Sequence, residues 1–240
     1  MQMSSRASRA LASSLASLLR YGRQSRLLAT SAAPSVLAVP NVWCVGRNYL
    51  EHCRELGNTA PSEEPMIFLK AGSSLLASGR KLVLPAWSRN VHHEIELGLI
   101  LGSDLQPEKA VVTLDLTARD IQAGLKQRQW PWSLAKTFPH STPVGSVFGI
   151  NGMDLQKLEL LLQVNGKLRQ QSSTEHMIFP IAELVQYIKD RFPVVPGDLI
   201  LTGTPEGVSA IQHGDHVVAQ VFSEGRKTLL SEGSWEVVQG

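Results

Sequence analysis

Two glutamates one residue apart, Glu94 and Glu96, lie in the run from Val91 to Gly98, where apolar residues alternate with them. This alternation predicts a β-strand, because residues i and i+2 of a strand project from the same face. Ile95 and Leu97 then fall on the opposite face, where they suit a packed core. Two carboxylates side by side repel each other unless a cation, a proton or water absorbs their charge. The run therefore predicts a strand whose acidic face either binds a cation or is solvated.

The length and composition of the chain allow one good-sized hydrophobic core, or at most two small domains. The chain has 240 residues, of which 43% are hydrophobic. Its ordinary content of charged and aromatic residues argues against disorder. No apolar run is long enough to span a bilayer, so we expect no membrane partner.

The first 30 residues have the composition of an organelle-targeting peptide. They contain five arginines, many serines and several leucines at helical spacing, and the first acidic residue of the chain is Glu51. An Arg-rich, Ser-rich, acid-free amphipathic N-terminus is typical of transit peptides. We therefore predict a mitochondrial transit peptide at 1–30, cleavage near 26–31, and localisation in the matrix. A plastid transit peptide and a basic tail are the alternatives.

The basic N-terminus also accounts for the positive charge of the chain. The whole chain has a net charge of +2, whereas the part beyond residue 30 has 18 basic and 21 acidic residues, a net charge of −3. This part has no basic run with interleaved aromatic residues, so nucleic acid is not an expected partner. The two cysteines, Cys44 and Cys53, have neither a disulfide framework nor a zinc-site spacing, which fits a reducing compartment.

After a linker at 31–41, the chain has the pattern of a β-rich α+β domain at 42–238. Strands are expected at 42–45, 66–69, 82–84, 91–101, 158–164, 167–171, 199–201 and 217–221, and helices at 49–56 and 180–189. The segment from Leu114 should begin as a strand and become a helix near Asp120 that carries Gln122. Asn48 is the expected N-cap of the first helix, and Lys70 is the expected stop of the second strand. The Asn-Gly pair at 165–166 predicts a type I′ hairpin turn. Many short strands without regular helix alternation favour the α+β class.

Five motifs follow one another along this domain: Val-Gly-Arg-Asn-Tyr at 45–49, Glu-x-Glu at 94–96, Leu-Asp-Leu-Thr-Ala-Arg-Asp at 114–120, Leu-Ala-Lys-Thr-Phe at 134–138 and Leu-Thr-Gly-Thr-Pro-Glu-Gly-Val at 201–208. Together they closely resemble the fumarylacetoacetate hydrolase family. Within the family they are most similar to the small mitochondrial acylpyruvate hydrolases, oxaloacetate decarboxylases and oxaloacetate tautomerases. The resemblance implies a mixed β-sandwich roll of the family's C-terminal-domain type with a few short helices, assembled as a homodimer.

The resemblance implies a metal site made by Glu94, Glu96 and Asp115. Three carboxylates without a cysteine form an all-oxygen site, which suits Mg²⁺ or Mn²⁺ better than zinc. A small 2-oxo acid could bind the metal through its carboxylate and keto oxygens, and the metal would stabilise the bound enolate. A solvated strand face is the alternative for the two glutamates taken alone. His92 would at most contact a metal ligand and would not bind the ion itself, because adjacent histidines of a strand point to opposite faces.

Three residues are implied to be catalytic: His52, Glu55 and Lys136. Glu55 follows His52 by three residues and would orient its imidazole, and His52 would remove a proton from water or from the substrate. Lys136 would place its ammonium against the developing enolate. The alternatives are an incidental His-Glu pair on a surface helix and an exposed lysine.

Five further residues are implied to bind the substrate: Arg47, Tyr49, Arg119, Gln122 and Thr204. Arg119 and Gln122 lie three apart in a helix and could bind the far carboxylate of the substrate. Arg119 could equally form a structural ion pair with an acid such as Asp120. Thr204 and the backbone amides around Gly203 could hold the first carboxylate in a nest, unless the loop is simply a turn that ends a strand.

One enolate, of pyruvate or oxaloacetate, could lead to three reactions. Attack of water activated by His52 would hydrolyse a C–C bond of an acylpyruvate, loss of CO₂ would decarboxylate oxaloacetate, and proton transfer at C3 would interconvert its keto and enol forms. The identity of the side chains does not rank these activities. An isomerase or hydrolase of larger dienoate substrates is a further alternative.

The segment from Gly102 to Leu114 is shorter than the family pattern predicts, by on the order of ten residues, or one strand with its turn. In the family, the Asp-x-Thr-x-Arg-Asp motif follows a helix and a strand containing Gly and Tyr. A register shift of one residue here would turn Asp115 to the wrong face. The departure supports a second hypothesis, in which the chain is a catalytically impaired family member that acts as a binding or assembly protein.

Overall fold

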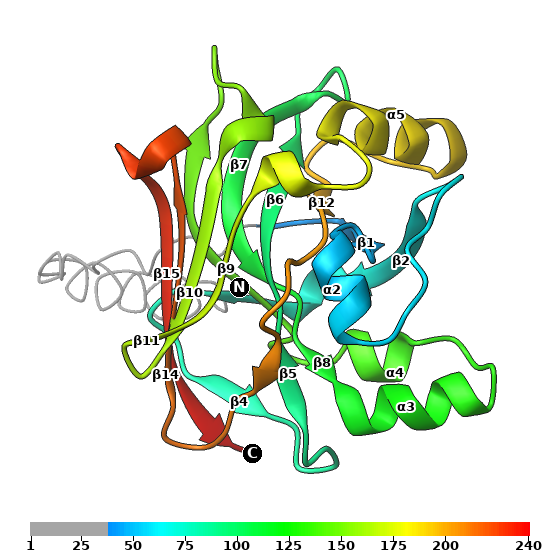
Figure 1. Cartoon of the computed structure of the whole chain (residues 1–240), viewed down its shortest axis with the longest axis vertical. Coiled ribbons are helices and arrows are strands. Elements are labelled where there is room, and N and C mark those ends of the chain that lie inside the picture. Colours follow the sequence, from blue (N-terminus) through cyan, green and yellow to red (C-terminus); the bar gives the residue numbers. More distant parts are fainter. Residues whose placement is uncertain (1–37) are drawn as a thin grey trace, which may run out of the picture. The chain divides into compact units, whose positions relative to one another are not determined.

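The computed structural model describes residues 38–240, so the predicted transit peptide and most of the predicted linker lie outside the described residues. The described chain is rich in strands and has few helices (Figure 1). The prediction of a β-rich α+β fold is thereby confirmed. Among the described residues, no helix is long and apolar enough to cross a membrane.

Three sheets organise the described residues. The seven-stranded sheet has the order β2 (Met66–Ala71), β1 (Asn41–Gly46), β12 (Leu199–Leu201), β6 (Ile95–Leu101), β7 (Pro107–Leu114), β9 (Thr142–Gly149) and β3 (Leu75–Ala77). The five-stranded sheet has the order β11 (Lys167–Ser173), β10 (Glu159–Val164), β14 (His216–Phe222), β15 (Leu229–Gln239) and β4 (Leu82–Leu84). A small third sheet has the order β13 (Ser209–Ala210), β5 (Val91–His93) and β8 (Thr117–Ala118). Parallel pairs, such as β1 with β12, occur beside antiparallel ones, so the architecture is mixed.

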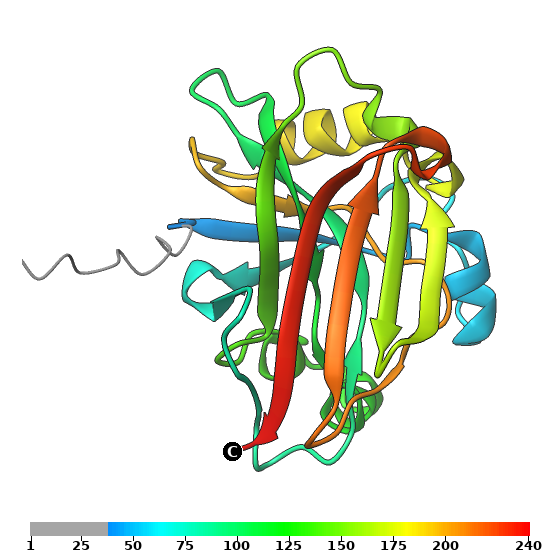
Figure 2. The same cartoon turned by 90° about the vertical axis from the view of Figure 1, so that its left-hand side faces the viewer.

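The two large sheets pack face to face around one core. Figure 2 shows β11, β10, β14 and β15 side by side in the five-stranded sheet. The main core cluster draws buried side chains from both layers, including Leu97 and Leu99 of β6, Leu160 and Leu162 of β10, and Trp235 of β15. Burial of a leucine side chain contributes about 1.5–3 kcal/mol, so these contacts hold the layers together.

Strand β6 lies in the middle of the large sheet and is covered on both faces. Each of its residues is buried, and Glu96 is only 2% exposed. The predicted single strand is interrupted at Glu94, which lies between β5 and β6 and is 4% exposed. The solvated face considered for Glu94 and Glu96 is therefore wrong. Gly98 is required in this strand, because a Cβ there would lie 2.7 Å from Thr113 Cγ2.

The shortened segment before Asp115 still forms the strand that it was expected to lack. β7 spans Pro107–Leu114 and pairs antiparallel with β6, with Ile95 opposite Leu114. The backbone N–H of Asp115 donates to the carbonyl of Glu94 over 2.8 Å. The register shift considered for Asp115 is therefore absent, and Asp115 lies on the same side as the two glutamates.

Four α-helices complete the described chain: α2 (Leu50–Glu55), α3 (Arg119–Gln127), α4 (Ser133–Lys136) and α5 (Ile181–Arg191). Short 3₁₀ helices lie at η1 (Gly72–Ser74), η2 (Leu155–Lys157), η3 (Thr174–His176) and η4 (Glu224–Arg226). The helix predicted from Pro180 is confirmed, as is the hairpin turn at 165–166, whose residues have φ of 53° and 71°. Helix α4 occupies a segment for which no helix was expected.

Two local predictions are wrong because tertiary contacts override them. Asn48 does not cap α2: its side-chain amide donates to the carbonyls of Phe179 and Thr202, and Tyr49 takes the N-cap position. Lys70 does not end β2, which continues to Ala71. Its side chain is fully buried, and the interior supplies it with partners that the local sequence does not reveal.

Candidate metal and catalytic site

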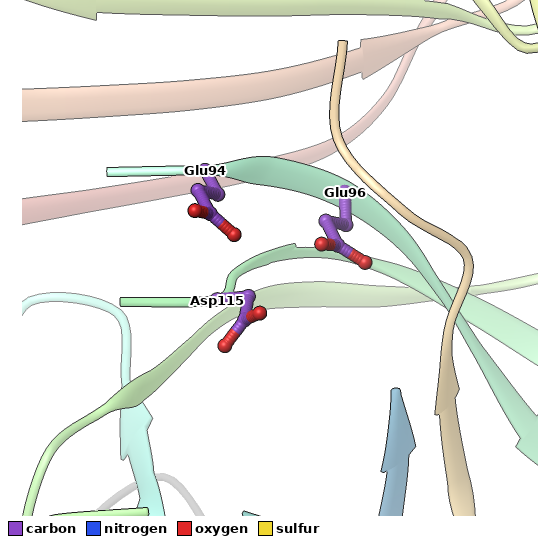
Figure 3. A group of neighbouring side chains, drawn as sticks. All are labelled: Glu94, Glu96 and Asp115. Atoms are coloured by element: carbon purple, nitrogen blue, oxygen red, sulfur yellow. The ribbon is translucent and has the colours of Figure 1, made fainter. Parts of the chain in front are cut away.

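Three buried carboxylates meet where β5, β6 and β7 come together. Glu94 precedes β6, Glu96 lies in it, and Asp115 follows its neighbour β7 (Figure 3). One oxygen from each side chain lies within 4.8 Å of the others. Because the strands place these oxygens, the geometry is set by sheet register rather than by a mobile loop.

The charges of these carboxylates fit a divalent ion. Burial and the proximity of Asp115 and Glu94 raise the pKa of Glu96 well above its ordinary value. Such repulsion is relieved when a cation lies between the carboxylates. All the donors are oxygens, which is the ligand type that Mg²⁺ and Mn²⁺ prefer. The residues therefore fit the metal site that the sequence predicts.

Three protein cations surround the same carboxylates. Lys136 Nζ donates to Glu94 Oε2 over 2.9 Å and also to Asp115 Oδ2. Lys70 Nζ donates to Asp115 Oδ1 over 2.7 Å, and Arg119 pairs with Glu94 Oε1. Burial alone would raise the pKa of Glu94, but Lys136 and Arg119 hold it well below its ordinary value. Three carboxylates and three cations thus balance before any ion or substrate binds.

The carboxylates lie in a pocket that gathers most of the residues expected to act on a substrate. Its lining includes Arg47, His52, Glu94, Glu96, Asp115, Arg119, Gln122, Lys126, Lys136 and Thr204. All five motifs of the sequence contribute to this lining, and His52, Gln122 and Lys126 add to it from outside the motifs. Glu55 and Tyr49, which were also expected at the site, do not line the pocket.

His52 and Glu55 lie on the same face of α2, as their spacing predicts. His52 Nδ1 is 3.6 Å from Glu55 Oε2, and the imidazole is largely buried. Burial lowers the pKa of His52, although Glu94 and Glu55 act to raise it. The backbone N–H of Gly207 donates to Glu55 over 3.1 Å, which ties α2 to the loop after β12. His52 is thus a neutral base at the pocket wall, with a carboxylate behind it.

Arg119 and Gly203, which were predicted to bind the two ends of the substrate, already have protein partners. Arg119 does not pair with Asp120; it donates to Gln122 Oε1 over 2.8 Å and pairs with Glu94. The predicted nest requires free backbone amides around Gly203. The N–H of Gly203 instead donates to Glu96 Oε2 over 2.6 Å, so this amide is not free to bind a substrate carboxylate.

Tyr49 and His92 are not part of the pocket lining. Tyr49 is buried, and its hydroxyl has no hydrogen-bond partner among the described residues. Its predicted substrate contact does not match this position. His92 Nε2 lies 3.0 Å from Asn90 Oδ1, and burial lowers its pKa to about 4. A place for His92 behind the metal site stays a prediction.

Comparison with known proteins identifies the family. The family model described as "Fumarylacetoacetate (FAA) hydrolase C-terminal" matches residues 41–230. The chain belongs to the fumarylacetoacetate hydrolase family. Mitochondrial oxaloacetate tautomerase FAHD1 from Homo sapiens is 40% identical over 192 residues, which cover 75% of this chain and 86% of the relative. FAHD1 from Arabidopsis thaliana is 40% identical over 205 residues, 81% of this chain and 89% of the relative.

Solved structures agree with the family assignment. Fumarylpyruvate hydrolase from Pseudomonas aeruginosa, in complex with Mn²⁺ and pyruvate, matches with a TM-score of 0.76 and 32% identity over 88% of this chain and 94% of that one. The 5-carboxymethyl-2-hydroxymuconate delta-isomerase from Mycobacterium smegmatis matches with a TM-score of 0.71 and 33% identity over 85% and 80%. These relatives place the chain among the enzymes of the fumarylacetoacetate hydrolase family.

Three residues of this fumarylacetoacetate hydrolase site were missed by sequence reasoning. Lys70 donates to Asp115, to the carbonyl of Ser141 over 2.6 Å and, more weakly, to a second backbone carbonyl. Gln170 donates to Thr204 Oγ1 over 2.9 Å, and it accepts from the N–H of Ile95 over 3.0 Å, next to Glu94. Lys126 is exposed and lines the pocket. A lysine inside the apolar run Met-Ile-Phe-Leu-Lys-Ala was the one available signal, since an unpaired lysine is rarely buried.

Proposed function

We propose that the chain is an Mg²⁺- or Mn²⁺-dependent enzyme that interconverts the keto and enol forms of oxaloacetate. The observation that carries the proposal is the cluster of Glu94, Glu96 and Asp115 in a pocket lined by His52 and Lys136. Relatives about 40% identical bear the name oxaloacetate tautomerase, and a structural relative was solved with Mn²⁺ and pyruvate. Both support a small 2-oxo acid as substrate.

The three carboxylates would hold the ion, which would supply Lewis-acid polarisation of the substrate's keto group. Lys136 then lies close to two of these carboxylates, with its ammonium buried at the same site. The three carboxylates balance the three cations that contact them, so a bound dication would leave this cluster with two excess positive charges. A dianionic 2-oxo acid would offset that excess, and a neutral substrate would not.

His52 is suited to move the proton of a tautomerisation. Its Nδ1 faces Glu55, so Nε2 is the nitrogen available to a molecule in the pocket. Nε2 would accept a proton from C3 of the keto form; the C–H electron pair would form the C2=C3 bond, and the π pair of the keto group would move to its oxygen. The imidazolium of His52 would return the proton to that oxygen to give the enol, and the reverse order gives the ketone. Glu55 would stabilise the imidazolium between the two steps.

Acylpyruvate hydrolysis and oxaloacetate decarboxylation are the second candidate activities of the same pocket. The structural match to a fumarylpyruvate hydrolase favours hydrolysis, in which Nε2 of His52 would deprotonate water instead of C3. The match to a muconate isomerase likewise supports a larger dienoate substrate as an alternative. All of these reactions need the same carboxylates, so only their relative rates separate them.

The deciding experiment measures turnover with and without the ion. Purified protein would be given enol oxaloacetate, keto oxaloacetate and acetylpyruvate, first with Mg²⁺ or Mn²⁺ and then after treatment with EDTA. We expect tautomerisation to be the fastest reaction, to stop in EDTA and to return when the ion is restored. Activity that persists in EDTA contradicts the metal-dependent mechanism. If the protein binds no ion and turns over no substrate, the hypothesis of an impaired binding or assembly protein is correct.

We also propose a mitochondrial location and a homodimeric state. The location rests on the predicted transit peptide at 1–30 and on the mitochondrial names of the relatives. Import of a fusion of residues 1–40 to a fluorescent protein tests it, and a plastid or cytosolic signal contradicts it. Light scattering of the purified protein tests the dimer, which a monomer mass would exclude.

A further inference from the structure

Helix α3 presents three polar residues to the pocket. Arg119, Gln122 and Lys126 lie at positions i, i+3 and i+7, so they share one helix face, and all three line the pocket. Arg119 and Gln122 lie at the inner end, where Arg119 bonds to Gln122 and pairs with Glu94. Lys126 follows one turn later and is exposed, whereas Gln122 is buried, so Lys126 lies on the solvent side of the lining, which we call the mouth. The helix thus leads from the carboxylate cluster to the entrance of the pocket.

Arg119 forms an ion pair with Glu94 of the carboxylate cluster, whereas Lys126 forms none. No carboxylate among residues 38–240 forms an ion pair with Lys126 or with Arg47, the other cation at the mouth. The ammonium of Lys126 lies 5.4 Å from the ring centroid of Trp132, which also lines the pocket. A cation–π contact of this kind restrains the ammonium without neutralising it.

Like charges surround this ammonium. Burial lowers the pKa of Lys126, and Arg47, Arg119 and Lys136 lower it further. The backbone of Arg47 has a positive φ of 61°. Cations that face one pocket and repel one another are relieved when an anion binds between them. Glu94 offsets part of this effect on the pKa of Lys126, but no carboxylate among residues 38–240 pairs with Lys126 or Arg47.

We propose that Lys126, together with Arg47, pairs with a second carboxylate at the far end of the substrate and so determines specificity for 2-oxo dicarboxylates. This inference rests on the proposed function, and it moves the far-carboxylate contact from Arg119 to Lys126. A 2-oxo acid bound by its carboxylate and keto oxygens at the cluster points its other end toward the mouth. A terminal carboxylate there meets an ammonium, whereas a terminal methyl group does not.

The test compares Lys126→Met with Arg128→Met. Both residues lie on or just after α3 and both cations sit over a tryptophan ring, but Arg128 lies over Trp130 and does not line the pocket. For Lys126→Met we expect the KM for oxaloacetate to rise by about fivefold, with kcat changed by less than about threefold, as loss of one exposed charge pair predicts. The KM for acetylpyruvate, which ends in a methyl group, should stay within about twofold. Arg128→Met should match the wild type with both substrates.

A binding measurement separates this inference from the proposed function. Malate and lactate share the 2-hydroxy acid end, but only malate has a second carboxylate. By calorimetry, wild-type protein should bind malate about tenfold or more tightly than lactate, and Lys126→Met should lose most of this preference. If Lys126→Met keeps both the preference for malate and the wild-type KM for oxaloacetate, the inference is wrong. If wild-type protein turns over no 2-oxo acid, the proposed function fails, while the malate and lactate titrations still decide the role of Lys126.

Discussion

The ammonium of Lys70 lies 2.7 Å from Asp115 Oδ1, and the two side chains are 0% and 1% exposed. The pair joins β2, at one edge of the seven-stranded sheet, to the end of β7 four strands away in the order of the sheet. Lys70 binds only Oδ1 of Asp115, so Oδ2 accepts from Lys136 and faces the carboxylate cluster. Lys70 is therefore the residue that orients the third carboxylate.

Replacement of Lys70 by methionine should destabilise the protein strongly. The change leaves a buried carboxylate without one of its two cations, which typically costs about 3–5 kcal/mol. Urea denaturation measures the free energy of unfolding. Lys109→Met is the matched control, because Lys109 is exposed and pairs with exposed Glu108, so its change should stay below about 1 kcal/mol. Equal stability of the two variants would show that the buried pair is not a stabilising contact.

Glu96→Gln should weaken metal binding while it stabilises the metal-free protein. Burial, Asp115 and Glu94 all disfavour the charged form of Glu96, so a neutral amide of the same shape removes repulsion. Removal of one charged ligand should lower the affinity for Mn²⁺ by about tenfold or more. Calorimetry with Mn²⁺ and the melting temperature without metal are the two readouts. A variant that melts below the wild type without metal contradicts the repulsion argument.

His52→Ala should abolish most turnover without loss of the metal site. A positioned general base contributes about 10²–10⁴-fold to a rate, so kcat should fall within this range. The dissociation constant for Mn²⁺ should remain that of the wild type. Glu55→Gln should reduce kcat by a smaller factor, because Glu55 acts through His52. His176→Ala, at an exposed histidine, serves as the control, and unchanged turnover in His52→Ala would remove His52 from the mechanism.

The stability of the metal-free protein should fall as the pH drops from about 6.5 to about 4. Burial, chiefly, lowers the pKa of His92 from 6.5 to about 4. In this window the unfolded chain binds a proton that the folded chain does not, so acid favours unfolding. Unfolding free energies at several pH values measure the slope. His92→Asn should reduce the slope, and buried His52 and His93, whose pKa values are also lowered, account for the remainder. His213→Asn, at an exposed site, should leave the slope unchanged; an unchanged slope in both variants would refute the contribution of His92.

Much of the fold follows from local patterns. The hairpin at 165–166, the helix after Pro180 and the strand containing Glu96 are all present where the sequence predicts them. These elements depend on neighbouring residues, such as the positive φ that Asn-Gly provides and the alternation that a strand requires. Asn48 follows the local rule for a helix cap, but it bonds to Phe179 and Thr202 instead, because a buried amide must satisfy its hydrogen bonds wherever partners lie.

The sequence by itself determined the chemistry of the site: three carboxylates in recognisable motifs, a His-Glu pair one helical turn apart and a lysine in a third motif. The tertiary structure decided how their charges are balanced. Lys70, Lys136 and Arg119 come from separate elements, and only the packed sheets bring their side chains against Glu94 and Asp115. The physical reason is that a strand pattern depends on neighbours in the chain, whereas a buried charge must be balanced by whatever the fold places around it.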